Sequence, residues 1–116
     1  FGIPVVEAQA CGVPVIVSDF SAQPELVGAG WLVEGVSAYT AIGSWQFKPS
    51  VPDILEALKA CYRRSEREVA TYAENARAKA SEYDADKVFE EFMLPALAEC
   101  EQRFDARKPQ TLRAAA

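Results

Sequence analysis

The first twelve residues, FGIPVVEAQACG, predict a glycine-containing loop that turns directly into a short helix. Pro4 suits the first helical position, because its missing N–H costs nothing there and its φ is already helical. Gly12 stands where a left-handed residue commonly ends a helix. The apolar run VPVIV follows at once, and it is typical of a buried parallel strand. This order indicates an α/β fold.

A second strand, GWLV, is predicted at residues 30–33, after one helical turn at residues 24–27 that Gly28 ends. Helix, strand, turn and strand in this order are typical of βαβ units, whose crossovers are nearly always right-handed. The prediction is therefore an α/β domain with part of a Rossmann-like parallel sheet, followed by C-terminal helices. In open α/β sheets the ligand crevice lies beyond the carboxyl ends of the strands, where residues 18–20 and 34–35 stand.

Residues 35–50 show no clear periodicity and predict a long irregular connection that contains Tyr39, Trp45 and Phe47. One interpretation is a loop that covers a ligand. The simpler interpretation, which we favour, is that these aromatic side chains pack a local insertion against the following helix.

Three helices are predicted after this connection. Ser50 begins the first with a capping-box pattern, the second covers about residues 69–80, and the third begins near Asp84. Pro95 should interrupt the third helix. The predicted buried stripe of the first helix is Ile54, Leu55, Leu58, Cys61 and Tyr62, and that of the third is Val88, Phe89, Phe92, Leu97, Cys100 and Phe104. We expect residues 1–104 to form the domain portion and residues 105–116 a flexible tail.

Composition excludes several classes of function. The net charge of −5 lacks the basic footprint of a nucleic-acid-binding protein. The chain has no histidine, so zinc sites and Ser-His or Cys-His catalysis gain no support. Three cysteines, Cys11, Cys61 and Cys100, favour buried thiols in a reducing cytoplasm over disulfides. No apolar run approaches a membrane span, and the start at Phe1, within a loop pattern, predicts the C-terminal part of a longer protein.

The helix start at residues 2–5 is a candidate anion site. Its first-turn amides and the positive end of the helix dipole attract phosphate. Gly2 lets a ligand approach the backbone closely, because no Cβ stands there. Glu7 lies one turn further along, where its carboxylate could accept hydrogen bonds from paired sugar hydroxyls. The alternative is a surface glutamate favoured by the helix dipole.

This segment resembles the donor-binding motif of retaining GT-B glycosyltransferases of family 4, also called glycosyl transferases group 1. That pattern is Glu-Gly-Phe-Gly-x-Pro-x-x-Glu-Ala-x-Ala-x-Gly, and its first glutamate would precede Phe1. The resemblance continues through PVIVSD, QPELVG and GWLV to about Phe104. The matching positions are Phe1, Gly2, Pro4, Glu7, Ala8, Ala10 and Gly12.

The resemblance implies a substrate and a set of binding residues. The substrate would be a nucleotide diphosphate sugar, and Glu7 would hold its ribose hydroxyls. Phe1, Gly2, Ile3, Pro4 and Val5 would border the diphosphate and the sugar, largely through their backbone. Glu25 would cap the turn helix and organise its loop. No catalytic residue is identified.

The implied activity is transfer of a glycosyl group to an unknown acceptor with retention. The phosphate clamp and the acceptor site would lie in the missing N-terminal domain, so this chain alone should be inactive. Asp19 is predicted to form a turn rather than to bind a metal, and neither metal nor cofactor is expected. The alternatives are a GT-B-fold sugar-nucleotide epimerase and a non-catalytic nucleotide-binding or interaction module.

Overall fold

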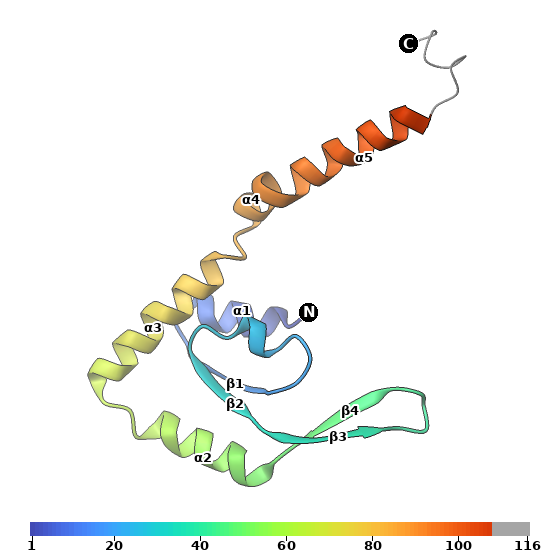
Figure 1. The fold of residues 1–116 in the computed structure, drawn as a ribbon. Coiled ribbons are helices and arrows are strands. Elements are labelled where there is room, and N and C mark those ends of the chain that lie inside the picture. Colours follow the sequence, from blue (N-terminus) through green and yellow to red (C-terminus); the bar gives the residue numbers. More distant parts are fainter. Residues whose placement is uncertain (108–116) are drawn as a thin grey trace. The chain divides into compact units, whose positions relative to one another are not determined.

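A computed structural model gives the fold, and it describes residues 1–107. The chain divides into two compact units, Phe1–Ser81 and a second that begins at Glu82. The elements of the first unit are α1 (Ile3–Ala10), β1 (Val15–Ser18), the 3₁₀ turn η1 (Pro24–Leu26), β2 (Gly30–Val33), β3 (Gly35–Tyr39), β4 (Trp45–Pro49), α2 (Val51–Tyr62) and α3 (Glu66–Ser81) (Figure 1). Of the helices in the described part of the chain, none is long and apolar enough to cross a membrane.

The end of α1 forms as its glycine predicts. Gly12 adopts a left-handed φ of +77°. Its amide donates to the Gln9 carbonyl at 2.8 Å, and the Val13 amide donates to the Ala8 carbonyl at 3.0 Å. These two bonds make a Schellman motif, which satisfies the last carbonyls of the helix. The chain then enters β1 two residues later than predicted, because Val13 closes the motif and Pro14 has no N–H to donate.

Strands β1 and β2 are parallel, with Val15 opposite Gly30 and Ser18 opposite Val33. Both predicted strands and the turn η1 between them are confirmed. Within residues 1–107 this sheet contains two strands, so the α/β class is confirmed while a full Rossmann-like sheet is not seen. Val17 and Val33, near the carboxyl ends of the strands, are buried.

Gln9 joins α1 to the segment between η1 and β2, and it is completely buried. Its amide nitrogen donates to the Leu26 carbonyl at 2.7 Å and to the Val5 carbonyl at 3.1 Å. Its amide oxygen accepts from the Gly28 amide at 2.7 Å and the Ala29 amide at 3.2 Å. The side chain therefore satisfies backbone groups of this segment that have no partner in the sheet.

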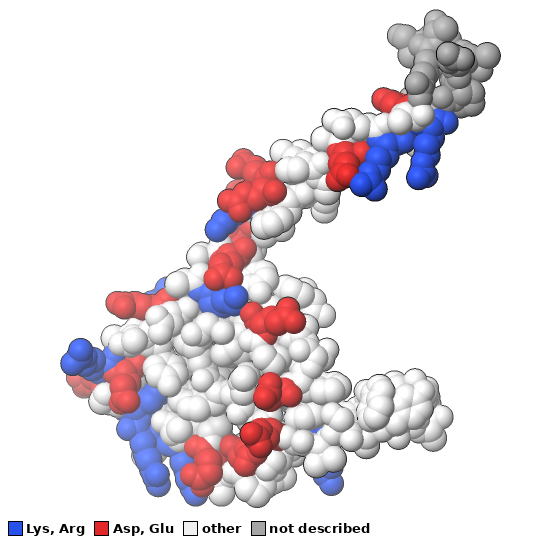
Figure 2. Space-filling model, viewed as in Figure 1, with Lys and Arg blue, Asp and Glu red and all other residues white. Residues whose placement is uncertain are grey.

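The prediction of an irregular connection at residues 35–50 is wrong, because β3 and β4 form an antiparallel hairpin there. Its turn is closed by Thr40, whose amide donates to the Ser44 carbonyl at 2.9 Å, and by Gly43 at a φ of +77°. The two strands that this turn joins are short and rich in aromatic and small residues. Their side chains show no clear alternation, so periodicity alone did not reveal two strands. Figure 2 shows the outer part of the hairpin without charged side chains.

The packing of the hairpin also corrects the favoured interpretation of its aromatic residues. Phe47 stacks on Phe20 of the loop after β1, with ring centroids 5.0 Å apart and an interplanar angle of 11°. Tyr39 and Trp45 pack edge to face on each other, at 5.4 Å and 68°. The Phe47–Phe20 contact therefore joins the hairpin to the loop after β1. The Tyr39–Trp45 contact joins the two strands of the hairpin.

Helix α2 begins at Ser50, whose side-chain oxygen accepts from the Asp53 amide at 3.4 Å, as the capping pattern predicts. Its inner face is narrower than predicted. Ala57 is buried, whereas three members of the predicted stripe, Leu55, Leu58 and Tyr62, are exposed. Leu58 borders a pocket with Val17 and Val33 of the sheet, and this open space leaves its side chain partly exposed.

Helix α3 begins with a capping box that sequence reasoning missed. The Ser65 hydroxyl and amide both donate to the Glu68 carboxylate, and the Ser65 oxygen accepts from the Glu68 amide. These bonds hold the pKa of the Glu68 carboxyl below its usual value. Ala76 and Ala80, within the second predicted helix, are buried.

Two contacts fasten α3 to the rest of the unit. A Cβ at Gly28 would lie 2.1 Å from Cβ of Lys79, so only glycine permits this approach. Tyr72 stacks on Trp31 of β2 at 5.2 Å, and the guanidinium of Arg64 lies over both rings. Helix and sheet are thereby held together by close packing and a cation–π contact.

The second unit consists of α4 (Ala85–Val88), the π-helical turn η2 (Phe89–Met93) and α5 (Leu94–Arg107). Asp84 caps α4, where the third helix was predicted to begin. The interruption predicted from Pro95 is confirmed, since the π turn lies just before it. Proline cannot donate the hydrogen bond that would continue the ladder. Residues 108–116, most of the predicted tail, lie outside the described part of the chain.

Two predictions of burial are wrong. The third helix does not bury its predicted inner stripe, since Val88, Phe89, Phe92, Leu97, Cys100 and Phe104 are all exposed. The three cysteines are free, but Cys11 and Cys100 are exposed and Cys61 is half-buried. Cys11 follows the last residue of α1, at the helix end, where its side chain meets solvent.

We expect Gln9→Leu to lower the free energy of unfolding by about 3 kcal/mol, because it keeps the volume but leaves buried backbone groups unpaired. Urea unfolding followed by tryptophan fluorescence measures this change. Gln102→Leu on the exposed surface of α5 is the matched control and should have little effect. Equal losses of unfolding free energy in the two variants would contradict the role of Gln9. Unchanged hydrogen exchange of the Gly28 and Ala29 amides in Gln9→Leu would also contradict it.

Candidate functional site

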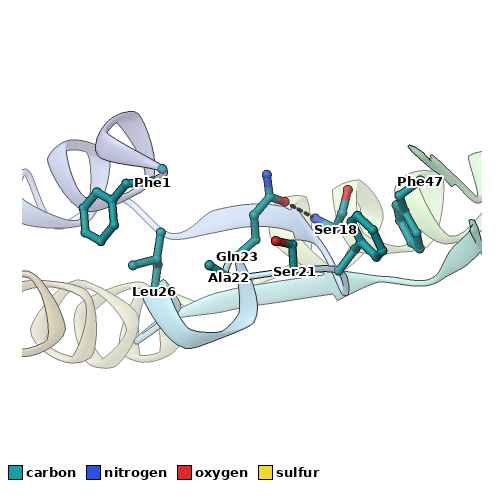
Figure 3. A pocket seen from close by; sticks show the side chains of 9 residues that line it. Phe1, Ser18, Ser21, Ala22, Gln23, Leu26 and Phe47 are labelled. Atoms are coloured by element: carbon teal, nitrogen blue, oxygen red, sulfur yellow. Dashed lines mark hydrogen bonds between the residues drawn. The ribbon is translucent and has the colours of Figure 1, made fainter. Parts of the chain in front are cut away.

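A cavity of about 420 Å³ opens where the start of α1 meets the loop after β1 (Figure 3). Phe1 and Gly2 approach it from the chain before α1, and the loop that follows β1 forms most of its wall. The hairpin contributes one ring from β4. The residues lining the cavity are Phe1, Gly2, Ser18, Phe20, Ser21, Ala22, Gln23, Leu26 and Phe47. The cavity thus lies at the carboxyl end of a parallel strand, where α/β folds bind ligands.

The loop after β1 is held by a hydrogen bond within it. The Gln23 amide oxygen accepts from the Ser18 amide at 2.9 Å (Figure 3). Ser21 has a φ of +58°, the left-handed region that non-glycine residues seldom adopt. The Asp19 amide donates to the Val33 carbonyl at 2.9 Å, which continues the ladder beyond β1. Together these features shape a tight loop whose side chains face the cavity.

An aromatic pair closes the side of the cavity next to the hairpin. Phe20 and Phe47 lie nearly parallel, and both line the cavity. A stacked pair of this kind adds about 1 kcal/mol beyond its buried area. It therefore fixes the loop and the hairpin relative to each other at the site.

The start of α1 offers fewer free amides than the sequence suggests. Helix α1 begins at Ile3, so Pro4 occupies the second helical position rather than the first. The Val5 amide donates to the Gly2 carbonyl at 2.9 Å. Pro4 has no N–H, and the helix has no side-chain cap. Among the described residues none accepts from the Ile3 amide, which remains available to a ligand.

Glu7 lies on the exposed side of α1, outside the lining of the cavity. None of the described residues forms a hydrogen bond or ion pair with its carboxylate. Ile3, Pro4 and Val5 are also outside the lining. The structure thus brings Phe1 and Gly2 to the cavity and places the other predicted binding residues beside it.

The loop is organised by a different residue than the one predicted. Glu25 is exposed, and within residues 1–107 nothing bonds its carboxylate, whereas Gln23 ties the loop to β1. Ser18 and Phe20 line the cavity, as the position of residues 18–20 after the first strand predicts, whereas Asp19 and residues 34–35 do not. Phe47 was missed as a cavity residue, since only folding brings it there. The signal for Gln23 was its place just before Pro24, at the N-cap of η1.

The described residues contain no group of three or more histidine, cysteine, aspartate or glutamate side chains placed to hold a metal ion. Asp19 is exposed and lies in the turn after β1. The polar groups that the cavity itself offers are hydroxyls and an amide, from Ser18, Ser21 and Gln23. Neutral groups of this kind suit a ligand rich in hydroxyls.

Known proteins resemble this chain at the level of the family. Residues 1–43, which include α1, the cavity loop and β2, match the family model of glycosyl transferases group 1. The chain is 38% identical over 79 residues to the O-antigen chain mannosyltransferase B of Escherichia coli, a match that covers 68% of this chain and 18% of that protein. No solved structure matches the chain. Residues 1–43 of this chain therefore belong to the glycosyl transferases group 1 family.

Proposed function

We propose that this chain is the nucleotide-sugar-binding part of a cytoplasmic, retaining GT-B glycosyltransferase. The observation that carries the proposal is the cavity itself. It joins the start of the family motif, at Phe1 and Gly2, to the loop at the carboxyl end of β1. A ligand there would meet the open helix start on one side and hydroxyl and amide groups on the other.

The donor would use three features of this site. The Ile3 amide and the positive end of α1 would face the diphosphate. Gly2 would leave room for the phosphate or the sugar. Glu7, exposed and without a bonding partner among the described residues, would accept hydrogen bonds from both ribose hydroxyls beyond the cavity rim.

The rest of the machinery would lie outside this chain, which spans about a fifth of the mannosyltransferase that it matches. We propose that the other motif glutamate, a basic phosphate clamp and the N-terminal domain complete the site. By similarity to that protein, the group transferred would be a hexose and the acceptor a saccharide chain. An epimerase would instead convert one nucleotide-sugar into another and would need no acceptor. A binding module would bind a nucleotide without catalysing any reaction.

The first prediction concerns Glu7 in the full-length protein. Glu7→Ala should weaken nucleotide-sugar binding by about 2 kcal/mol, or about thirtyfold, because charge-assisted hydrogen bonds are lost. Stability should change little, since the side chain is exposed. Calorimetry with a panel of UDP- and GDP-sugars measures the affinity, and Glu25→Ala, another exposed carboxylate, is the matched control. Unaltered affinity in Glu7→Ala would refute the assignment.

The second prediction tests whether Gly2 leaves room for a ligand or is needed only for packing. A Cβ there would lie 2.9 Å from Cδ1 of Leu26, a residue only 2% exposed. Gly2→Ala should therefore cost about 1 kcal/mol of stability and also lower turnover more than tenfold. The double variant Gly2→Ala with Leu26→Val relieves the clash, and we expect its turnover to stay more than tenfold below that of Leu26→Val alone. Recovery of turnover in that double variant would show that Gly2 serves packing alone.

The third prediction is that transfer by the full-length protein continues in EDTA. We propose that helix amides and basic side chains supplied outside this chain offset the charge of the leaving diphosphate. Sugar transfer and sugar release are measured with EDTA and with added Mn²⁺. Activity that disappears in EDTA and returns with Mn²⁺ would contradict the proposal. Acceptor-dependent turnover by the 116-residue chain alone would contradict the proposed division of the site.

A further inference from the structure

One face of the β3–β4 hairpin is aromatic, and its outer rings, Tyr39 and Trp45, are largely exposed. Gly35 pairs with Pro49, Ser37 with Phe47 and Tyr39 with Trp45, so these side chains share one face of the two-stranded sheet. Tyr39 and Trp45 are 63% and 64% exposed. We call Tyr39, Trp45 and Phe47 the aromatic face.

The aromatic face is continuous with the cavity. Phe47 lines the cavity and stacks on Phe20, and Trp45 follows two residues before Phe47 on the same strand. Residues two apart along a strand lie about 7 Å from each other, so Trp45 offers a stacking position separate from the Phe20–Phe47 pair. A ligand that extends from the cavity along β4 would therefore meet Phe47 first, then Trp45 with Tyr39.

The chemistry of the hairpin selects the kind of ligand. Lys48 is the only charged residue between Gly35 and Pro49, and by register its side chain is on the opposite face, across from Val36. Hydroxyls stand near the rings, at Ser37 on the same face and at Thr40 and Ser44 in the turn. The uncharged outer part of the hairpin is visible in Figure 2. A nucleic acid or an anionic membrane surface needs cations that this face lacks.

We propose that the aromatic face binds the pyranose rings of a neutral saccharide acceptor and leads its end to the cavity. The polarised C–H groups on the apolar side of a pyranose ring stack on the electron-rich face of an aromatic ring. The flanking hydroxyls bond to the hydroxyls at the edge of the sugar. This inference rests on the proposed function, and it assigns to the hairpin an acceptor contact additional to those of the N-terminal domain.

The test uses the full-length protein and a neutral manno-oligosaccharide as the probe. In Trp45→Ala the Kd of the oligosaccharide, measured by calorimetry, should rise about tenfold, while the Kd of the nucleotide-sugar should not change. The acceptor KM should rise with it. Trp45→Phe, which keeps an aromatic ring, should retain most of the affinity. Val36→Ala is the matched control, because Val36 is exposed on the opposite face.

Several results would overturn the proposal. Oligosaccharide affinity that is the same in Trp45→Ala and Val36→Ala excludes the aromatic face as an acceptor contact. Loss of binding to lipid vesicles in Trp45→Ala, with oligosaccharide affinity intact, would show that the aromatic face contacts a membrane. Loss of self-association in light scattering, with oligosaccharide affinity intact, would show that it contacts a second copy of the chain. Failure of the wild type to bind any nucleotide-sugar would refute the proposed function instead. The oligosaccharide titration would still decide the role of the aromatic face.

Discussion

The hydrogen bonding of Gln9 is the interaction on which the first unit depends. The segment between η1 and β2 has backbone groups that no strand pairs with, and Ala29 at its end is buried. One amide side chain meets this need, because it has two donors and a carbonyl with two acceptor positions. It bonds to Leu26, Gly28 and Ala29 of that segment and to Val5 of its own helix. These bonds hold α1 against the segment just before β2.

The cavity is a consequence of this arrangement. Because Gln9 holds α1 against the start of β2, the opposite end of α1, with Gly2, is held near Leu26. The loop after β1 then closes the space between Gly2 and the hairpin, and the bond between Ser18 and Gln23 keeps it tight. The residues that hold the unit together therefore also shape the cavity. A change in the packing of Leu26 would alter the shape of the cavity as well as the stability of the unit.

Much of the local structure could be predicted from the residues alone. The helix with its Gly12 end, both parallel strands, the turn at Pro24, the Ser50 cap and the interruption at Pro95 all follow from short-range sterics and hydrogen bonding. The hairpin was missed because its strands carry aromatic residues without a clear alternation and are joined by a turn without a strong glycine pair. The predicted stripes of the later helices were too wide. Sequence periodicity gives the apolar side of a helix but not how much of it a partner covers.

The sequence by itself determined the order of most of the elements, the family motif at the start of α1 and the Gly12 end of that helix, since these depend on neighbours along the chain. Only the tertiary structure decided that Gln9 is a buried link, that Gln23 rather than Glu25 organises the loop, and that Phe20 meets Phe47 at the cavity. These contacts join residues from separate elements. Their geometry depends on how helix, sheet and hairpin pack together, which no local pattern specifies.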